Sequence, residues 1–388
     1  MKYRENKKNN DMLSILGFGC MRFPNDEALV EKQILYAVEN GVNFFDTAYI
    51  YKDSEATLGR VLKKLNLREK IKLSTKLPHY FIKKYEDLDK IFYKQLERLQ
   101  TDYIDYYFMH MLTDVNVWKR LAGLGILKWI DEKKASGQIK NVGFSYHGGK
   151  DEFIKLADIY PWEFCMIQYN YLDEHRQAGK SGLSYAASKG IPVFIMEPLR
   201  GGRLVNNLPK EIISLFEKAH IKRTPAEWAL RWVWNHPEVT CVLSGMNSLE
   251  MVGENISVAS NVCENEFTQE EHELFEKVKK IMSDKTRVPC TGCNYCMPCP
   301  RGVDIPTCLS CYNNIEIEGK FPAIIKYMMQ TSFKSKPQIA SLCNKCGKCE
   351  KHCPQKIEIR KELASTSKAL EKFWFKPVSK LVKAFMKI

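Results

Sequence analysis

Eight short apolar segments rich in Val, Ile, Phe and Tyr alternate with longer segments of helical periodicity between residue 13 and about residue 260. A strand followed by a helix, repeated eight times in about 250 residues, predicts a closed (β/α)8 barrel of the TIM type. A doubly wound open sheet is the alternative arrangement of the same elements. The predicted strands start at Ser14, Asn43, Ile71, Ile104, Ile139, Phe164, Ile191 and Val239.

The helical segments between these strands are amphipathic, and residues 27–41 end with a Gly at the position of a left-handed helix cap. Residues 268–285 predict a charged helix that begins with a capping box, because Glu271 follows Thr268 by three residues. This helix joins the barrel to a different kind of sequence. We predict a barrel domain over residues 1–283, a small domain over 284–362 and a basic tail over 363–388.

The cysteines are unevenly distributed. Of the fourteen, ten lie within residues 290–353, whereas Cys20, Cys165, Cys241 and Cys263 are scattered. No run of about 18 uncharged apolar residues is present, and the N-terminus lacks the apolar stretch of a signal peptide. We therefore expect a soluble cytoplasmic protein, whose reduced and clustered thiols bind metal and do not form disulfides.

The net charge of +13 does not predict nucleic-acid binding. Residues 360–388 carry eight Lys or Arg against two Glu, which gives +6, so the tail accounts for about half of the excess. The rest lies on helices where Lys and Glu alternate, as on a solvated face. The tail would fit an anionic membrane surface or dock as a helix, although Pro377 interrupts its pattern. Its apolar residues are Phe373, Trp374, Phe375, Leu381, Val382, Phe385 and Met386.

Polar residues at the carboxyl ends of barrel strands are the first candidates for an active site. Asp46 ends the second predicted strand, Tyr51 follows it, Lys76 ends the third and His110 ends the fourth. Each alone has an ordinary structural interpretation as a cap, a surface residue or a packing residue. Together, the order Asp-Thr-Ala-x-x-Tyr, then Lys, then His resembles the aldo-keto reductase family.

This resemblance implies NAD(P)H-dependent reduction of a small carbonyl compound. Tyr51 would donate the proton to the carbonyl oxygen, and Lys76, held by Asp46, would lower the pKa of the phenol. His110 would hydrogen-bond the same oxygen. Tyr49 is the nearest competitor for the proton donor, and Lys52 stands where the family usually has Gly.

The resemblance also implies a cofactor site without a G-x-G-x-x-G motif, which this chain lacks. The sequence departs from the family at Tyr146, His147, Met196, Glu197 and Met251, and offers no basic residue at the usual 2′-phosphate position, so NAD and NADP are both open. The implied residues are Ser145 and Gln168 for the carboxamide, Pro198, Leu199, Gly201 and Gly202 near the pyrophosphate, Ser244, Gly245, Met246 and Asn247 at a helix start, and Glu254 and Asn255 toward the adenine.

The second domain carries two related cysteine runs. Cys343, Cys346, Cys349 and Cys353 with Pro354 match the C-x2-C-x2-C-x3-C-P run of bacterial ferredoxins. Cys290, Cys293, Cys296 and Cys299 with Pro300 form a copy that is one residue shorter.

The chain thus resembles the iron-sulfur subgroup of the family, with a small ferredoxin-like α+β domain that binds two 4Fe-4S clusters. By analogy with two-cluster ferredoxins, the fourth Cys of each run would bind the other cluster. Cys353 would join the first run, and Cys299 the second. Structural zinc is the alternative. Cys308 and Cys311 form a further C-x2-C pair, to which we assign no metal.

The two modules differ in electron number, because nicotinamide transfers two electrons as hydride and a 4Fe-4S cluster transfers one. A flavin, a radical-tolerant substrate, or a ferredoxin or flavoprotein partner would have to split the pair. Otherwise the clusters only stabilise the domain. A hypothesis of another class is a non-catalytic barrel that serves as an interaction or electron-transfer subunit.

Overall fold

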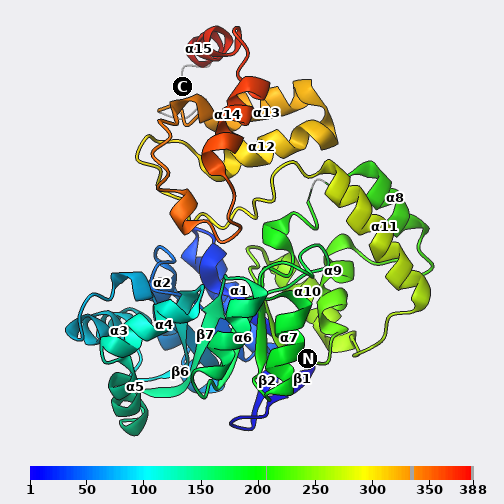
Figure 1. Cartoon of the computed structure of the whole chain (residues 1–388). Helices are drawn as coiled ribbons and strands as arrows, with labels where there is room; N and C mark the ends of the chain where they lie inside the picture. Colours follow the sequence, from blue (N-terminus) through cyan, green and yellow to red (C-terminus); the bar gives the residue numbers. More distant parts are fainter. Residues whose placement is uncertain (207, 333–335, 386–388) are drawn as a thin grey trace. The chain divides into compact units, whose positions relative to one another are not determined.

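The computed structural model describes residues 1–206, 208–332 and 336–385 (Figure 1). It contains two compact units. The first comprises Met1–Leu199 and Arg223–Gln269, and the second comprises Arg200–Lys222 and Glu270–Ile388. Each unit is therefore described by itself.

The first unit is a closed barrel of eight parallel strands, in the order β10-β3-β4-β5-β6-β7-β8-β9. This confirms the predicted (β/α)8 fold and excludes the open sheet. Each strand lies within one of the predicted apolar segments or extends slightly beyond it. The strands are β3 (Leu16–Gly19), β4 (Phe44–Asp46), β5 (Lys72–Leu77), β6 (Ile104–Leu112), β7 (Ile139–Tyr146), β8 (Phe164–Gln168), β9 (Val193–Met196) and β10 (Val239–Ser244).

Helices follow the strands around the barrel (Figure 1). The first begins at Asp26, whose carboxylate accepts the N–H groups of Ala28 and Leu29, and it ends before Gly41, which has the predicted left-handed conformation with φ of +87°. The helices of this unit are α1 (Glu27–Glu39), α2 (Ser54–Lys64), α3 (Glu86–Leu99), α4 (Val115–Gly123), α5 (Ile126–Ala135), α6 (Lys150–Asp158), α7 (Gly179–Ser188), α9 (Pro225–Trp234) and α10 (Leu249–Asn261).

Helices α2 and α3 pack at very short range. A Cβ atom on Gly59 would lie only 2.3 Å from the carbonyl oxygen of Arg98, so any larger residue there would force the helices apart. Glu55 is buried in the same contact and accepts hydrogen bonds from Thr75 and Gln95. This packing fixes the start of α2, and with it the loop that leads from β4 to α2.

An antiparallel hairpin, β1 (Tyr3–Asn6) and β2 (Asp11–Ser14), precedes the barrel and was not predicted. Leu13 of β2 packs with the residues of the barrel interior. The Tyr106 hydroxyl donates to Asp11 at 2.7 Å and accepts from Asn6 at 3.1 Å. The hairpin therefore covers the end of the barrel where the strands begin.

The interior of the barrel is filled by large side chains, most of them aromatic, so it is a packed core without a channel. Phe44 and Phe194 have ring centroids 4.7 Å apart, and Phe108 and Phe164 lie edge to face at 4.6 Å. A site for a ligand is therefore left at the carboxyl ends of the strands. The core residues are Leu13, Phe44, Tyr106, Phe108, Phe164, Met166, Phe194, Cys241 and Leu243.

The second unit is built from helices and cysteine-rich loops. It contains α8 (Lys210–Lys218), α11 (Gln269–Lys285), α12 (Ile305–Glu318), α13 (Lys320–Thr331), α14 (Ile359–Leu370) and α15 (Phe375–Phe385). Its described residues include no strand, so the predicted α+β character is wrong in its β part. The physical reason is that both cysteine runs contain several residues with positive φ, which interrupt an extended strand.

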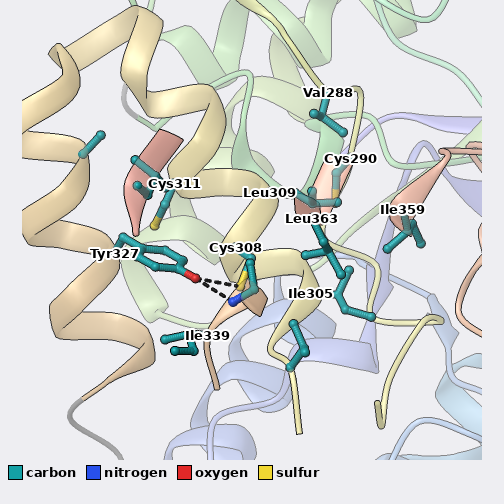
Figure 2. Close-up of a cluster of buried hydrophobic side chains, with 14 of the residues drawn as sticks. Val288, Cys290, Ile305, Cys308, Leu309, Cys311, Tyr327, Ile339, Ile359 and Leu363 are labelled. Carbon is teal, nitrogen blue, oxygen red and sulfur yellow. Dashed lines mark hydrogen bonds between the residues drawn. The ribbon is translucent and has the colours of Figure 1, made fainter. Parts of the chain in front are cut away.

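The core of the second unit surrounds Tyr327, as Figure 2 shows. The Tyr327 hydroxyl accepts the N–H of Ala340 at 2.6 Å, donates to Glu371 at 2.7 Å, and lies 3.8 Å from the sulfur of Cys308. Cys308 and Cys311 both face this core from α12 and are buried. Both pack in this core.

The beginning of the predicted tail also belongs to this core. Leu363 and Leu370 of α14, and Phe375 of α15, are buried in it, so the predicted boundary after residue 362 falls inside a helix. Farther on, Phe373 and Leu381 are exposed. The side chains of Val382 and Phe385, and all of Met386, lie outside the described residues. Among the described helices, none is both long and apolar enough to span a membrane.

Candidate active site and metal centre

A buried ion pair joins two of the predicted catalytic residues. The Lys76 ammonium lies 2.6 and 2.8 Å from the two carboxylate oxygens of Asp46 and also donates to the carbonyl of Thr47 at 2.7 Å. Asp46 accepts a further hydrogen bond from Ser74 at 2.7 Å. Both members are almost fully buried, at 1% and 4% exposure. Burial lowers the pKa of Lys76, and the Asp46 charge opposes that shift.

The two candidate tyrosines have different surroundings. The Lys76 nitrogen lies 4.8 Å from the centre of the Tyr51 ring, and that ring is 6.1 Å from the His110 ring. Tyr49 instead lies under the guanidinium of Arg98, at 4.5 Å. The structure thus places Tyr51, and not Tyr49, beside the buried ammonium.

The loop that carries Tyr51 is held by backbone and hydroxyl hydrogen bonds. The Tyr51 N–H donates to the carbonyl of Ala48 at 2.9 Å, and the hydroxyl groups of Thr47 and Ser54 lie 2.8 Å apart. Ser54 also donates to the carbonyl of Cys20 at 2.9 Å. Lys52, where the family usually has Gly, adopts a positive φ of 27°. The loop therefore keeps these hydrogen bonds with Lys52 in the place of Gly.

Histidines form the third part of the site. His110, on β6, is 1% exposed, and its pKa is well below the ordinary value because of burial, with smaller effects from Lys76, His147 and His79. His110 is thus neutral at physiological pH and has an N–H to donate. His147 was noted in the sequence only as a departure, yet it is buried, and its Nδ1 lies 3.2 Å from the side-chain oxygen of Gln177.

The predicted carboxamide residues lie on neighbouring strands, β7 and β8. Ser145 accepts the N–H of Met111 at 2.8 Å. The Gln168 amide donates to Asp173 at 2.8 Å and accepts from Gln177 at 2.9 Å. These hydrogen bonds fix the orientation of the Gln168 side chain. Sequence reasoning did not find Asp173 or Gln177, because both lie in an irregular loop with no motif.

The predicted phosphate residues follow β10. Ser244 accepts from Asn255 at 2.9 Å, and Ser248 caps α10 by accepting the N–H of Met251. The intervening residues Gly245, Met246 and Asn247 therefore lie directly before a helix N-terminus. Glu254 accepts from Thr224 at 2.5 Å.

One cation near this loop escaped the sequence analysis. A Cβ atom on Gly245 would lie 3.6 Å from the Cδ of Arg22, which ends a short helical turn, Cys20–Arg22, after β3. No motif marked Arg22, because its proximity to Gly245 arises from the pairing of the first and last barrel strands.

The remaining predicted cofactor residues follow β9. Pro198 and Leu199 belong to the barrel unit, whereas Gly201 and Gly202 belong to the second unit and have φ of +66° and +90°. The structure thus assigns this predicted group to both compact units. Its role in cofactor binding stays a prediction.

The cysteines of the second unit line two cavities. One is lined by Cys296, Cys299, Cys343, Cys346 and Cys349, and the other by Cys290, Cys293, Cys296 and Cys353. The last Cys of each run therefore lines a cavity together with cysteines of the other run. Burial raises the pKa of Cys296, and the charges of Cys290, Cys293 and Cys353 raise it further, which reflects the proximity of these four sulfurs.

The two runs also share their backbone conformation. Gly292 and Lys345 occupy the same place in their runs and have φ of +73° and +62°, and Asn294 and Gly347 have +66° and +74°. These turns direct N–H groups toward sulfur, as when the Lys345 N–H donates to Cys343 at 3.4 Å. Such hydrogen bonds stabilise thiolates and tune cluster potentials. The described residues contain no group of His, Cys, Asp or Glu arranged to hold a single metal ion.

The buried histidines predict a loss of stability in acid. His147 has a pKa of about 4 in the folded protein against an ordinary value of 6.5, because of burial. As the pH falls, the unfolded chain therefore binds a proton at this residue before the folded chain does. The contribution of neutral His147 to the free energy of unfolding is complete above pH 6.5 and is lost as the pH falls toward 4. At pH 5 the loss is about 2 kcal/mol.

Replacing His147 by Gln should reduce the fall in the free energy of unfolding between pH 7.5 and pH 5 by about 2 kcal/mol. The measurement is urea denaturation followed by tryptophan fluorescence. The matched control is His175→Gln, at an exposed position, which should leave the fall unchanged. Equal pH dependence in the wild type and His147→Gln would contradict the prediction.

Comparison with known families supports both modules. The model of the aldo/keto reductase family matches residues 15–280, and that of a 4Fe-4S dicluster domain matches residues 289–358. Among curated relatives, a glyoxal reductase of Bacillus subtilis is 29% identical over 58% of this chain and 76% of its own length. An NADH-specific methylglyoxal reductase of Escherichia coli is 24% identical over 60% of this chain and 83% of its own.

Solved structures show the same fold. An aldo-keto reductase of Bacillus halodurans in its holo form is 26% identical, covers 72% of this chain and 96% of its own, and superimposes with a TM-score of 0.59. An aldo-keto reductase of Klebsiella pneumoniae in complex with NADPH superimposes with a TM-score of 0.58 over 72% of this chain and 95% of its own. Its sequence is 20% identical, so this comparison shows the fold alone. The chain therefore belongs to the aldo/keto reductase family and carries a C-terminal domain of the 4Fe-4S dicluster type.

Proposed function

We propose that the barrel reduces a small aldehyde or ketone with NAD(P)H, with Tyr51 as the proton donor. The observation that carries this proposal is the Lys76 ammonium, which is held by Asp46 and lies beside the Tyr51 ring. The names of the relatives, a glyoxal reductase and a methylglyoxal reductase, favour a small carbonyl substrate.

The chemistry follows from where charge develops. When bound, the nicotinamide supplies a hydride to the carbonyl carbon. The carbonyl oxygen then gains negative charge, and the Tyr51 hydroxyl donates its proton to it. Lys76 stabilises the resulting phenolate, and Asp46 keeps Lys76 charged in spite of its burial. Neutral His110 donates a hydrogen bond to the same oxygen, which orients the substrate.

The cofactor would bind across the ends of the later strands. Ser145 and the oriented amide of Gln168 would hold the carboxamide, and Pro198 and Leu199 would line the pyrophosphate. The N-terminus of α10, with Ser244 to Asn247 and the guanidinium of Arg22, would bind phosphate. Glu254 and Asn255 would face the adenine.

The Tyr51 assignment predicts a sharp difference between two neighbouring tyrosines. Tyr51→Phe should lower kcat for the NAD(P)H-dependent reduction of methylglyoxal by about 10²- to 10⁴-fold, because it removes the proton donor. Tyr49→Phe is the matched control and should retain activity within about threefold. Unchanged activity in Tyr51→Phe would contradict Tyr51 as the proton donor, and wild-type protein without reductase activity would favour the alternative of a non-catalytic barrel.

We further propose that the second unit binds two 4Fe-4S clusters with exchanged fourth ligands. Cys290, Cys293 and Cys296 would share one cluster with Cys353, and Cys343, Cys346 and Cys349 would share the other with Cys299. Support comes from the two cavities that these sets line. Burial raises the pKa of Cys353, and N–H groups of Gln355, Lys356 and Ile357 oppose that shift by stabilising its thiolate. When bound, each cluster accepts or gives one electron.

Iron counting tests the ligand sets. Anaerobic wild-type protein should contain about eight iron and eight sulfide per chain, since each cluster has four of each. The triple variant Cys290→Ala/Cys293→Ala/Cys296→Ala should retain about four of each. In that background, Cys299→Ala should remove most of the remaining iron, whereas Cys353→Ala should not.

The buried pair outside the cavities provides the control. Cys308→Ser and Cys311→Ser should keep the full iron content, because neither residue lines either of these two cavities. Colourless wild-type protein, or zinc in place of iron, would contradict the proposal.

The clusters add one-electron chemistry to the barrel. We propose that they relay electrons between the barrel and a ferredoxin or flavoprotein, with a flavin as a further candidate for the step that combines single electrons into pairs. Reduction of a carbonyl to an alcohol consumes two electrons and two protons, and two clusters store two electrons. A purely structural role is the competing explanation.

Reduction without nicotinamide separates these explanations. Protein reduced by dithionite, freed of excess reagent and mixed anaerobically with methylglyoxal should reoxidise its clusters and form about one alcohol per two electrons. The absorbance of the clusters and the product are measured together, and Tyr51→Phe is the control, which should slow both changes. If neither reoxidation nor product is seen in the wild type, the clusters do not serve the reaction.

A further inference from the structure

We propose that the loops of the second cysteine run form a docking face for an acidic protein that carries single electrons. This inference rests on the proposed iron-sulfur function. It begins from Cys346, which is the exposed member of the eight motif cysteines, all of which the structure describes. The other seven are buried or half-buried. The second run therefore offers the more accessible edge for electron transfer.

Lysines surround this edge. Lys345 and Lys348 flank Cys346 in the sequence, Lys351 and Lys356 follow, and all four are exposed. We call these four residues the basic rim. The acidic residues nearby are already paired, because Glu350 binds Arg360 at 2.8 Å and Glu358 binds Lys361 at 3.0 Å. Within the described residues, no ion pair neutralises the basic rim.

The first cysteine run provides an internal comparison. Lys345 and Lys356 correspond to Gly292 and Gly302 in the first run, and Lys348 corresponds to Tyr295. The equivalent loop of the first run thus has almost no charge, with Arg301 as its basic residue. The basic rim is not a requirement of the cysteine loop, since the first run has the same conformation without it.

Two of the four lysines occupy unfavourable backbone positions. Lys345 and Lys356 have φ of +62° and +50°, close to the +73° and +75° of Gly292 and Gly302. A residue with a Cβ atom is strained in this region, and Gly is not. The chain therefore carries a cation at two positions where Gly would fold more easily. Neither side chain is buried, so packing does not explain them.

Charge complementarity identifies the partner. A positive surface around an exposed redox site attracts a partner with a negative surface and raises its association rate. The partner must also exchange one electron with the cluster, which nucleic acids and lipid surfaces do not do. In each encounter the reduced carrier loses one electron and the cluster gains it, with no bond made and no proton moved. Two encounters deliver the pair that a carbonyl reduction consumes.

The experiment measures binding of a purified acidic bacterial ferredoxin to the anaerobic holoprotein by isothermal titration calorimetry at several salt concentrations. Lys345→Glu/Lys348→Glu/Lys351→Glu should raise the Kd about tenfold or more and flatten its dependence on salt. Lys345→Gly/Lys356→Gly should raise the Kd by a smaller factor. Because it relieves backbone strain, this variant should keep or raise the Tm and keep the iron content, which excludes misfolding as the cause.

The control variant is Lys277→Glu/Lys280→Glu/Lys320→Glu, which changes the same charge on exposed lysines that line neither cavity. Its Kd should stay within about twofold of the wild type. Carbodiimide cross-linking should join ferredoxin carboxylates to the basic rim, as mapped by mass spectrometry. Basic cytochrome c is the second probe, and the charge-reversed variant should bind it better than the wild type does.

Three results would overturn the proposal. They are an unchanged Kd in both rim variants, cross-links that map elsewhere, or rim variants that lose binding only to vesicles of anionic lipid. The relay fails separately, because docking without reoxidation by methylglyoxal would leave the basic rim established and the relay refuted. Reoxidation with an unchanged Kd would instead support the relay and refute the basic rim as the docking face.

Discussion

The structure of the barrel mouth depends on one buried ion pair. Removing an ammonium from water costs several kcal/mol unless a carboxylate and further hydrogen bonds compensate it. Here Asp46 supplies both oxygens, Thr47 supplies a carbonyl, and Ser74 holds the carboxylate. The pair joins the ends of β4 and β5 and places a positive charge under Tyr51. The contact that stabilises the barrel end therefore also places an ammonium beside the phenol that we propose as the proton donor.

Sequence reasoning recovered the elements that repeat and the residues fixed by their place on a strand. All eight barrel strands were predicted, since a buried strand needs an apolar run, and Asp46, Lys76 and His110 followed from the strand ends. The residues that were not predicted take their places from contacts between segments that are distant in the sequence. Arg22 meets Gly245 only because β3 and β10 close the barrel, and Gln177 orients Gln168 from an irregular loop.

The small unit shows the same limit in another form. The analogy with two-cluster ferredoxins predicted that the runs exchange their last members, and this ligand exchange stays a prediction. The small domain was expected to be α+β, but its described residues contain no strand. Left-handed residues in its loops are visible in a sequence only where they are Gly. Lys345 and Lys356 gave no such signal. Likewise, the predicted tail boundary ignored the apolar face of α14, whose Leu363 and Leu370 complete the core around Tyr327.

The second unit is discontinuous in the sequence, and this has a consequence for how the two modules depend on each other. Residues 200–222, which contain α8, leave the barrel sequence directly after Leu199 and group with the C-terminal part, where Lys285 binds Glu211 at 2.7 Å. The C-terminal part is thus no simple appendage. A chain cut after residue 269 would keep every barrel strand yet deprive this excursion of its packing partners.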